Sequence, residues 1–414
     1  MPALTPFRAW RYAPGSNLAA VTAPPYDVLS PAEAARYKAR DRHNITHIDL
    51  PTPTASGYSR AGATLRNWQK AGILRRDATP SLTLYRLTAD TATATGQHSI
   101  LGVIGALPVV DEGAGGVLPH EQVTAKASAD RLDLTRATQA NLSPVWGLSL
   151  AKGLAAALQT IWDDALTTPD GPRPAGLNDN GVTHEVLPIS DPAAIATIGA
   201  LLKPYDVLIA DGHHRYGVAR RYRDEVRAAL ACGTPSDKAN APALSPAERT
   251  LAFVSELAAE QLNVEAIHRV YDGPSFAALQ AKLADSFELS PAPAVSPEML
   301  DEMRRQGRLV LLAPDGSASW LTPRAGVFDG IRALDGLWLE QALAGLPGLE
   351  VTYQHDLDEL LAGLPQHSGA VLIRPTSIAE IRRTAIEGLL MPPKSTFFTP
   401  KLQTGLVLRS LDEL

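Results

Sequence analysis

Residues 207–216 (Val-Leu-Ile-Ala-Asp-Gly-His-His-Arg-Tyr) place a short apolar run directly before a cluster of polar side chains. The run from Val207 to Ala210 has the length of one buried strand. Asp211-Gly212 is a turn signal, and residues 216–230 carry apolar side chains at helical spacing. The stretch therefore predicts a strand, a tight turn and a helix, and the rest of the fold must accommodate them.

The predicted turn puts His213, His214 and Arg215 at or near the N-terminus of the helix. Backbone N–H groups there lack partners within the helix, and the helix dipole adds partial positive charge. Such an end binds anions, usually phosphate, and an arginine adds charge-assisted hydrogen bonds. Histidine can donate a hydrogen bond, move a proton or bind a metal. We predict an anion site here; the alternative is a solvated turn before an arginine-rich helix face.

Composition limits the class of protein. The chain has 414 residues, which fits two or three domains or one large domain with insertions, and 45% of them are hydrophobic. A net charge of −6 without a long basic run argues against a nucleic-acid-binding face. The single cysteine, Cys232, excludes an internal disulfide. The chain has no signal-peptide-like start and no run of about 18 apolar residues. We therefore expect a cytoplasmic protein without a membrane span.

The order of elements predicts the fold class. Residues 184–230 are expected to form a strand, a helix, a strand, the turn and a further helix. This order predicts a mixed α/β (α+β) fold, in which a central sheet carries the strand–turn–helix phosphate site at the carboxyl end of a strand. The expected organisation is an N-terminal α/β region over residues 1–232, a loop or linker over 233–249 and a C-terminal α/β region over 250–414.

A glycine-rich loop at residues 113–116 precedes a second polar stretch. His120-Glu121 follows this loop and is a candidate for a general base or a metal-binding pair. It is not the zinc-protease arrangement, because no second histidine lies four residues on. We expect Glu121 to act in catalysis and His120 to contact the substrate.

Two further stretches combine proline with polar side chains. Pro24-Pro25 stiffens the backbone before Tyr26 and Asp27, which are expected to bind the substrate; an ordinary turn is the alternative. Near the C-terminus, a proline-braced loop over residues 391–405 is expected to return to the site. It carries the phosphate-compatible donors Lys394, Ser395, Thr396 and Lys401. It lacks the glycine spacing of a P-loop, and simple docking of this segment is the alternative.

Taken together, these motifs resemble one family. Pro-Pro-Tyr-Asp-Val at 24–28, Ile-Ala-Asp-Gly-His-His-Arg-Tyr at 209–216 and Met-Pro-Pro-Lys-Ser-Thr-Phe-Phe at 391–398 carry the resemblance, with His120-Glu121, Thr124, Asp130-Arg131 and Pro400-Lys401. The chain is similar over essentially its whole length to the family called domain of unknown function 1015. Members of that family carry glutamate where Gly217 stands here, so no role is assigned to that position. The family name implies no activity.

The turn also has a local resemblance that implies chemistry. Asp211-Gly212-His213-His214-Arg215-Tyr216 is similar to the Gly-Cys-His-Arg-Tyr turn of sulfiredoxins and to the turn of the free serine kinases in the partition-protein (ParB-like) superfamily. The resemblance implies that His214 and Arg215 bind nucleotide phosphates. His213 stands where sulfiredoxins have their reactive cysteine, which excludes sulfiredoxin chemistry and leaves phosphate binding or phosphoryl transfer.

These inferences give one leading hypothesis and two alternatives. The leading hypothesis is a nucleotide-dependent phosphotransferase (kinase) that acts on a small, serine-like hydroxyl metabolite, with ATP or ADP and Mg²⁺ as expected cofactors. Its expected catalytic residues are Glu121, His213 and Asp211, and its expected phosphate ligands are Gly212, His214, Arg215, Lys394, Ser395, Thr396 and Lys401. The alternatives are a metal-assisted phosphatase or hydrolase using His120, Glu121, Asp211 and His213, and a non-catalytic nucleotide-binding protein.

Overall fold

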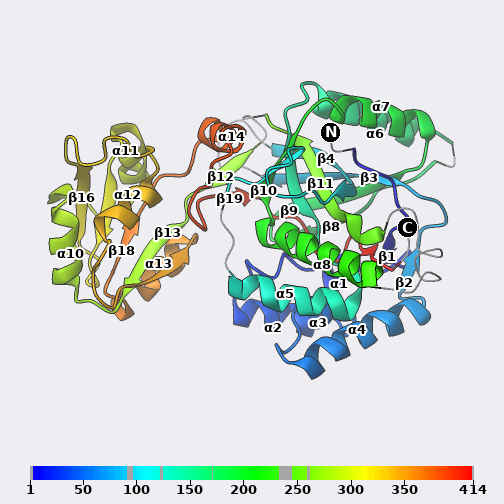
Figure 1. Cartoon of the computed structure of the whole chain (residues 1–414), viewed down its shortest axis with the longest axis horizontal. Coiled ribbons are helices and arrows are strands. Elements are labelled where there is room, and N and C mark those ends of the chain that lie inside the picture. Colours follow the sequence, from blue (N-terminus) through cyan, green and yellow to red (C-terminus); the bar gives the residue numbers. More distant parts are fainter. Residues whose placement is uncertain are drawn as a thin grey trace. The chain divides into compact units, whose positions relative to one another are not determined.

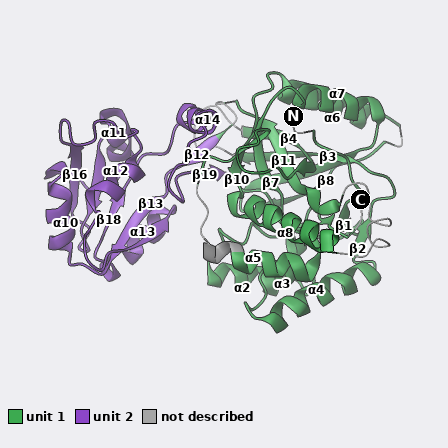
Figure 2. Cartoon of the chain, in the orientation of Figure 1, with its two compact units in different colours: residues 1–262, 400–414 green, residues 263–399 purple. Residues whose placement is uncertain are grey.

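The chain folds into two compact units (Figures 1 and 2). A computed structural model describes residues 3–90, 97–121, 125–169, 171–232, 245–258 and 262–412. Unit 1 comprises residues 1–262 and 400–414, and unit 2 comprises residues 263–399. The boundary after Leu262 differs from the predicted linker at 233–249, of which residues 233–244 lie outside the described residues. Thr124 of the family pattern lies outside them as well.

Unit 1 is built on an eight-stranded mixed sheet with the order β5-β10-β7-β11-β4-β3-β9-β8. The strands are β3 (Leu82–Asp90), β4 (Gln97–Pro108), β5 (Val117–Leu118), β7 (Val145–Ser149), β8 (Ala175–Asp179), β9 (Val182–Ile189), β10 (Val207–Asp211) and β11 (Arg249–Glu256). β10 runs parallel to β5 and antiparallel to β7. β11, which the predicted organisation assigned to the C-terminal region, pairs with β4 and β7 inside this sheet.

Helices cover both faces of this sheet, with α6 and α7 on one face and α8 on the other, where α5 packs against α8 (Figure 1). The helices of unit 1 are α1 (Leu18–Val21), α2 (Pro31–Arg40), α3 (Thr46–Asp49), α4 (Ala55–Lys70), α5 (Ala125–Thr138), α6 (Leu154–Thr167), α7 (Pro192–Leu202) and α8 (His213–Cys232). Two short strand pairs complete it: β1 (Trp10–Tyr12) with β2 (Leu74–Arg76), and β6 (Ala140–Asn141) with β20 (Arg409–Ser410). This arrangement confirms the predicted mixed α/β class.

Local sequence signals set several of these boundaries. The hydroxyl of Ser30 accepts a hydrogen bond from the backbone N–H of Glu33, whose carboxylate accepts one from the N–H of Ser30, so α2 begins with a full capping box. Asp191 caps α7 through the N–H of Ala194, and proline occupies the first helical position, as predicted. The core beside α6 and α7 includes the buried side chains of Leu158 and Trp162.

Unit 2 contains a six-stranded antiparallel sheet with the order β14-β16-β15-β18-β13-β17. Its strands and helices are β12 (Asn263–Glu265), β13 (His268–Asp272), α10 (Phe276–Ala284), β14 (Phe287–Pro291), α11 (Pro297–Gln306), β15 (Leu309–Leu312), β16 (Ala318–Pro323), α12 (Asp335–Ala342), β17 (Glu350–Gln354), α13 (Leu357–Gly363), β18 (Gly369–Leu372), α14 (Ile378–Ile386) and β19 (Phe397–Thr399). β15 alternates between two cores: Leu309 and Leu311 pack with α10 and α12, and Val310 and Leu312 with α11 and α13. This two-sided burial explains its unbroken apolar sequence. None of the helices described in either unit has the length and hydrophobicity of a membrane-spanning segment.

Gly102 on β4 supplies the first testable prediction. A Cβ atom at Gly102 would lie 2.4 Å from the ring of Phe253, which is fully buried. That ring is itself packed edge-on against Tyr85 and Trp146. We therefore expect Gly102→Ala to destabilise unit 1 by about 1–3 kcal/mol through overpacking. Gly199→Ala on α7 is the matched control, since a Cβ there meets nothing within 4 Å, and it should be neutral or stabilising. Urea unfolding measures both; equal stability of the two variants would contradict the packing.

Candidate functional site

Gly212 is the pivot of the predicted turn. β10 ends at Asp211, α8 begins at His213, and Gly212 between them has a φ of +89°. A Cβ at Gly212 would meet the guanidinium of Arg215 at 3.0 Å. Glycine therefore permits both the left-handed backbone and the return of the Arg215 side chain over the turn. The predicted strand, tight turn and helix are confirmed.

Asp211 holds two cations. Its Oδ2 accepts a hydrogen bond from Nη2 of Arg215, and its Oδ1 lies 2.6 Å from Nζ of Lys401. Arg215 also donates through Nη1 to the carbonyl oxygen of Pro144. All three charged side chains are largely buried, with exposed fractions of 18% for Asp211, 10% for Arg215 and 12% for Lys401. The ion triad fixes the start of α8 against the C-terminal segment of unit 1.

His120 and His213 face each other beside this triad. Their rings are 4.6 Å apart and nearly perpendicular, and the backbone N–H of His120 donates to Nε2 of His213 at 3.4 Å. Burial lowers the pKa of His120 to about 4. Burial, with the neighbouring His120, lowers the pKa of His213 well below its usual value. Both imidazoles are therefore neutral at pH 7, where they can exchange hydrogen bonds but supply no positive charge.

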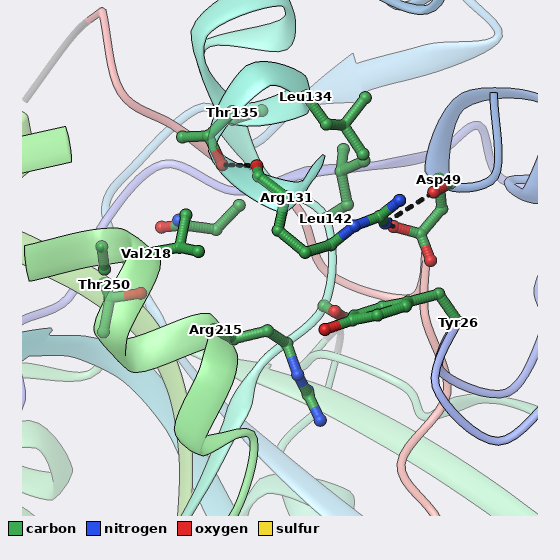
Figure 3. Close-up of a pocket in the computed structure, with 13 residues that line it drawn as sticks. Tyr26, Asp49, Arg131, Leu134, Thr135, Leu142, Arg215, Val218 and Thr250 are labelled. Atoms are coloured by element: carbon green, nitrogen blue, oxygen red, sulfur yellow. Dashed lines mark hydrogen bonds and ion pairs between the residues drawn. The ribbon is translucent and has the colours of Figure 1, made fainter. Parts of the chain in front are cut away.

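A small cavity lies next to Arg215 (Figure 3). Its volume is about 50 Å³, and its lining combines apolar side chains with polar ones, among them Tyr26, Asp49, Arg131 and Arg215. The guanidinium of Arg131 lies 4.2 Å from the ring centre of Tyr26, and its Nη1 donates to the carbonyl oxygen of Asp49 at 2.7 Å. Its Nη2 forms an ion pair with Asp130 at 2.6 Å. Two guanidinium groups and one carboxylate thus line the cavity.

Several buried polar atoms at this site have no hydrogen-bond partner among the described residues. They are the hydroxyl of Tyr26, Oδ1 of Asp27 and Nε of Arg215. Burial, with the nearby Asp27, raises the pKa of Tyr26 above its usual value, so its hydroxyl keeps its proton. Because a buried polar group without a partner is costly, these atoms mark places where a ligand can bond.

The structure brings together part of the predicted site. Unit 1 contains Tyr26, Asp27, His120, Glu121, Asp211, Gly212, His213, His214, Arg215 and Lys401. Glu121 is part-buried and directly follows His120. Lys394, Ser395 and Thr396 belong to unit 2, where the hydroxyl of Ser395 donates to the carbonyl oxygen of Pro392 at 2.7 Å.

Asp49 and the role of Arg131 were not predicted from the sequence. Asp49 lies on α3 and is 5% exposed, and Arg131 lies on α5 and is 7% exposed. The sequence assigned a role to neither residue, because a charged segment usually lies on a solvated face. The family pattern, which includes Asp130-Arg131, was the available signal for Arg131. In the described parts of the chain, no group of three or more His, Cys, Asp or Glu side chains could hold a metal ion.

The fold and the site define an α/β protein with an arginine-bearing turn at the start of a helix. The family described as "Protein of unknown function (DUF1015)" matches residues 4–337. The chain belongs to this family, which confirms the predicted resemblance; the match ends before the motifs at 391–398 and 400–401. Among curated proteins, none matches the sequence significantly.

The comparison with solved structures finds matches at low identity. A mutant free serine kinase in complex with ADP is 10% identical, with a TM-score of 0.38, and the match covers 70% of this chain and 89% of that one. SbnI from Staphylococcus aureus, truncated at its C-terminus, is 12% identical with a TM-score of 0.38 and coverages of 73% and 87%. A conserved hypothetical protein from Pyrococcus furiosus is 11% identical with a TM-score of 0.36 and coverages of 70% and 92%. Such TM-scores do not establish a shared fold.

Protonation of His120 supplies a second prediction. Between pH 6.5 and about pH 4 the unfolded chain binds a proton at this position and the folded chain does not, so stability falls as the pH falls. We expect His120→Gln to remove part of this slope, up to about 3 kcal/mol by pH 4. His47→Gln, at an exposed histidine, should leave the slope unchanged. Urea unfolding from pH 7.5 to pH 4.5 measures it; equal slopes for His120→Gln and the wild-type chain would refute burial of a neutral His120.

Proposed function

We propose that unit 1 is a nucleotide-dependent phosphotransferase that acts on a hydroxyl group of a small metabolite. The observation that carries the proposal is the meeting of Arg215 and Lys401 at Asp211, at the N-terminus of α8. The carboxylate of Asp211 compensates only one of the two side-chain cations, so one positive charge remains, and the helix dipole and the first N–H groups of α8 add to it. This suits a polyphosphate better than a neutral ligand.

Arg215 has a bonding group to offer such a ligand. Its Nη atoms are engaged by Asp211 and Pro144, while its buried Nε has no partner among the described residues. Burial lowers the pKa of Arg215, but the pairing with Asp211 outweighs it, so the net pKa is raised and the guanidinium is permanently charged. Asp211 therefore acts as a positioning residue that fixes Arg215 and Lys401 for phosphate binding.

The cavity indicates the kind of acceptor. About 50 Å³ is far below the roughly 300–1,000 Å³ of typical ligand pockets, so a nucleotide would place at most a phosphate group there. Arg131 and Arg215 suit a carboxylate, and Asp49 suits an ammonium group. A small amino acid with a hydroxyl group, such as a serine-like one, meets these charge requirements when only its charged end enters the cavity. Mg²⁺ would arrive bound to the nucleotide phosphates, since the described residues hold no ligand cluster for it.

The transfer needs a proton acceptor. The acceptor hydroxyl oxygen forms a bond to the terminal phosphorus of the nucleotide, the bridging phosphorus–oxygen bond breaks, and its electron pair leaves with the shortened nucleotide. The hydroxyl proton passes to a carboxylate. Asp27 suits this role, because its Oδ1 is buried and lacks a partner among the described residues, whereas both oxygens of Asp211 are engaged. Glu121, which the sequence favours, is the second candidate.

Positioning and charge stabilisation would come from groups already in place. Phosphoryl transfer requires little covalent participation by the protein, so aligned cations and a proton acceptor suffice. No described contact favours the metal-assisted hydrolase over transfer, since His120, Glu121, Asp211 and His213 do not form a ligand group in the described ranges. The third possibility, a nucleotide sensor, differs from the enzyme in one observable: it binds without turnover.

The test is phosphorus NMR on the full chain with ATP or ADP, Mg²⁺ and small hydroxyl amino acids. A new phosphate ester should form. Asp27→Asn should lower kcat by at least about 100-fold and leave the nucleotide Kd nearly unchanged, because asparagine keeps the shape of the base without its charge. Glu121→Gln is the comparison and should lose less than about tenfold.

Other outcomes would change the proposal. A larger loss of kcat in Glu121→Gln than in Asp27→Asn would identify Glu121 as the proton acceptor. Release of phosphate from a phosphorylated metabolite, without consumption of nucleotide, would replace the transferase with a hydrolase. Nucleotide binding with no ester from any acceptor would favour the sensor.

A further inference from the structure

A second cavity in unit 1 is lined by four arginines. They are Arg8 in the N-terminal arm, Arg76 at the end of β2, Arg249 at the start of β11 and Arg409 on β20. The cavity has a volume of about 130 Å³, and its other lining residues are Thr5, Pro6, Phe7, Ala106 and Ser410. None of the described residues that line it is acidic. In a chain with a net charge of −6, this local excess of positive charge is not a product of general composition.

Backbone pairing holds these distant segments together. Thr5 exchanges two backbone hydrogen bonds with Ala106 on β4, and Phe7 exchanges two with Ser81. Trp10 on β1 is paired with Arg76 on β2, and Arg249 on β11 with Pro108 on β4. The cavity wall is therefore built from strands and from the N-terminal arm that pairs with them. This pairing fixes the backbone position of each arginine.

Other buried arginines of unit 1 are neutralised by carboxylates. Arg131 contacts Asp49 and Asp130, Arg215 contacts Asp211, and Arg223 contacts Asp111 and Asp224. These carboxylates raise the pKa of Arg131 and of Arg215 despite burial. The usual arrangement in this chain is thus a buried guanidinium with an acidic partner, as the cost of burying a lone charge requires.

Arg409 departs from that arrangement. It is 4% exposed, and it donates to the carbonyl oxygens of Arg249 and Pro246 at 2.8 Å and to the side chain of Asn141 at 3.4 Å, all uncharged acceptors. No carboxylate in the described part of the chain lies within ion-pair distance of it. Burial, with the charge of Arg249 nearby, lowers the pKa of Arg409 to about 10, so it remains charged at pH 7.

The nearby acidic groups are already engaged. The carboxylate of Asp77 accepts from Arg11 at 3.0 Å, while Arg8 reaches only the backbone oxygen of Asp77, at 2.9 Å. Asp412 accepts a hydrogen bond from the hydroxyl of Ser410 and is exposed. Burial also lowers the pKa of Arg249, whose guanidinium donates to the carbonyl oxygen of Ala3 at 3.3 Å.

We propose that this cavity is a second anion site, which binds a tetrahedral oxyanion: inorganic phosphate or the phosphate group of a metabolite. Its volume is several times the roughly 30 Å³ of a water molecule and well below that of a typical ligand pocket, so it fits one such group. Guanidinium groups bind phosphate oxygens in a bidentate manner. The cavity shares no lining residue with the one beside Arg215, so the proposal is independent of the transferase.

The experiment is calorimetric titration of the full chain with inorganic phosphate, with methyl phosphate and acetate as comparison ligands. Arg249→Gln should weaken phosphate affinity at one site at least tenfold. Arg173→Gln is the control, because Arg173 is exposed and, like Arg249, donates to a single backbone carbonyl. Lys401→Met, which alters the turn, should leave this site unchanged and so separates it from the proposed function.

Thermal unfolding distinguishes a loss of phosphate binding from a loss of folding in the variants. In phosphate-free buffer Arg249→Gln should be at least as stable as the wild-type chain, since it removes repulsion of Arg409. Added phosphate should raise the Tm of the wild-type chain and of Arg173→Gln but not that of Arg249→Gln. Arg8→Gln should repeat this pattern. Binding of methyl phosphate as tight as that of phosphate would identify a metabolite phosphate group as a ligand, and weaker binding would identify the free ion.

Three results would overturn the proposal. The first is wild-type phosphate affinity in both Arg249→Gln and Arg8→Gln. The second is acetate binding as tight as phosphate binding. The third is an equal loss of stability in Arg249→Gln with and without phosphate, which would give Arg249 a purely structural role.

Discussion

The candidate site depends on the charge of one carboxylate. Asp211 is the last residue of β10. It forms ion pairs with Arg215, four residues later, and with Lys401, which is 190 residues later. The first pair shapes the turn around Gly212, and the second ties the C-terminal segment of unit 1 to the start of α8. Without that negative charge, two largely buried cations would face each other uncompensated. Such unpaired buried charges destabilise a protein by more than a buried ion pair stabilises it. The same carboxylate thus maintains the fold locally and sets the charges for a ligand.

Neutral and charged groups have separate roles around Asp211. His120 and His213 are buried and neutral at pH 7, so they shape the turn without adding charge. The cationic character comes from Lys401 and from Arg215, and the pairing with Asp211 raises the pKa of Arg215 despite its burial. Under the proposed function, these two side chains and not the histidines would attract the anion.

Local sequence patterns predicted the helices and strands well, whereas contacts between residues far apart in the sequence could not be predicted. The capping box at Ser30 and the strand, glycine and helix around Gly212 depend on adjacent residues, so the sequence predicts them. The Lys401–Asp211 pair joins residues 190 positions apart, and Arg131 meets Asp49 across 82 positions. No local pattern encodes such distances. The division after Leu262 follows from the pairing of β11 inside the first sheet, which is also a non-local property.

The central claim is that Lys401 and Arg215, held by Asp211, bind the phosphates of a nucleotide. Calorimetric titration of a nucleoside diphosphate into the wild-type chain, Lys401→Met and Lys152→Met tests it most directly, because Lys152 is an exposed lysine of the same unit. A charged hydrogen bond to phosphate contributes about 1.5–3 kcal/mol, so Lys401→Met should weaken binding at least tenfold while Lys152→Met binds like the wild-type chain. Unchanged affinity in a folded Lys401→Met would contradict the account.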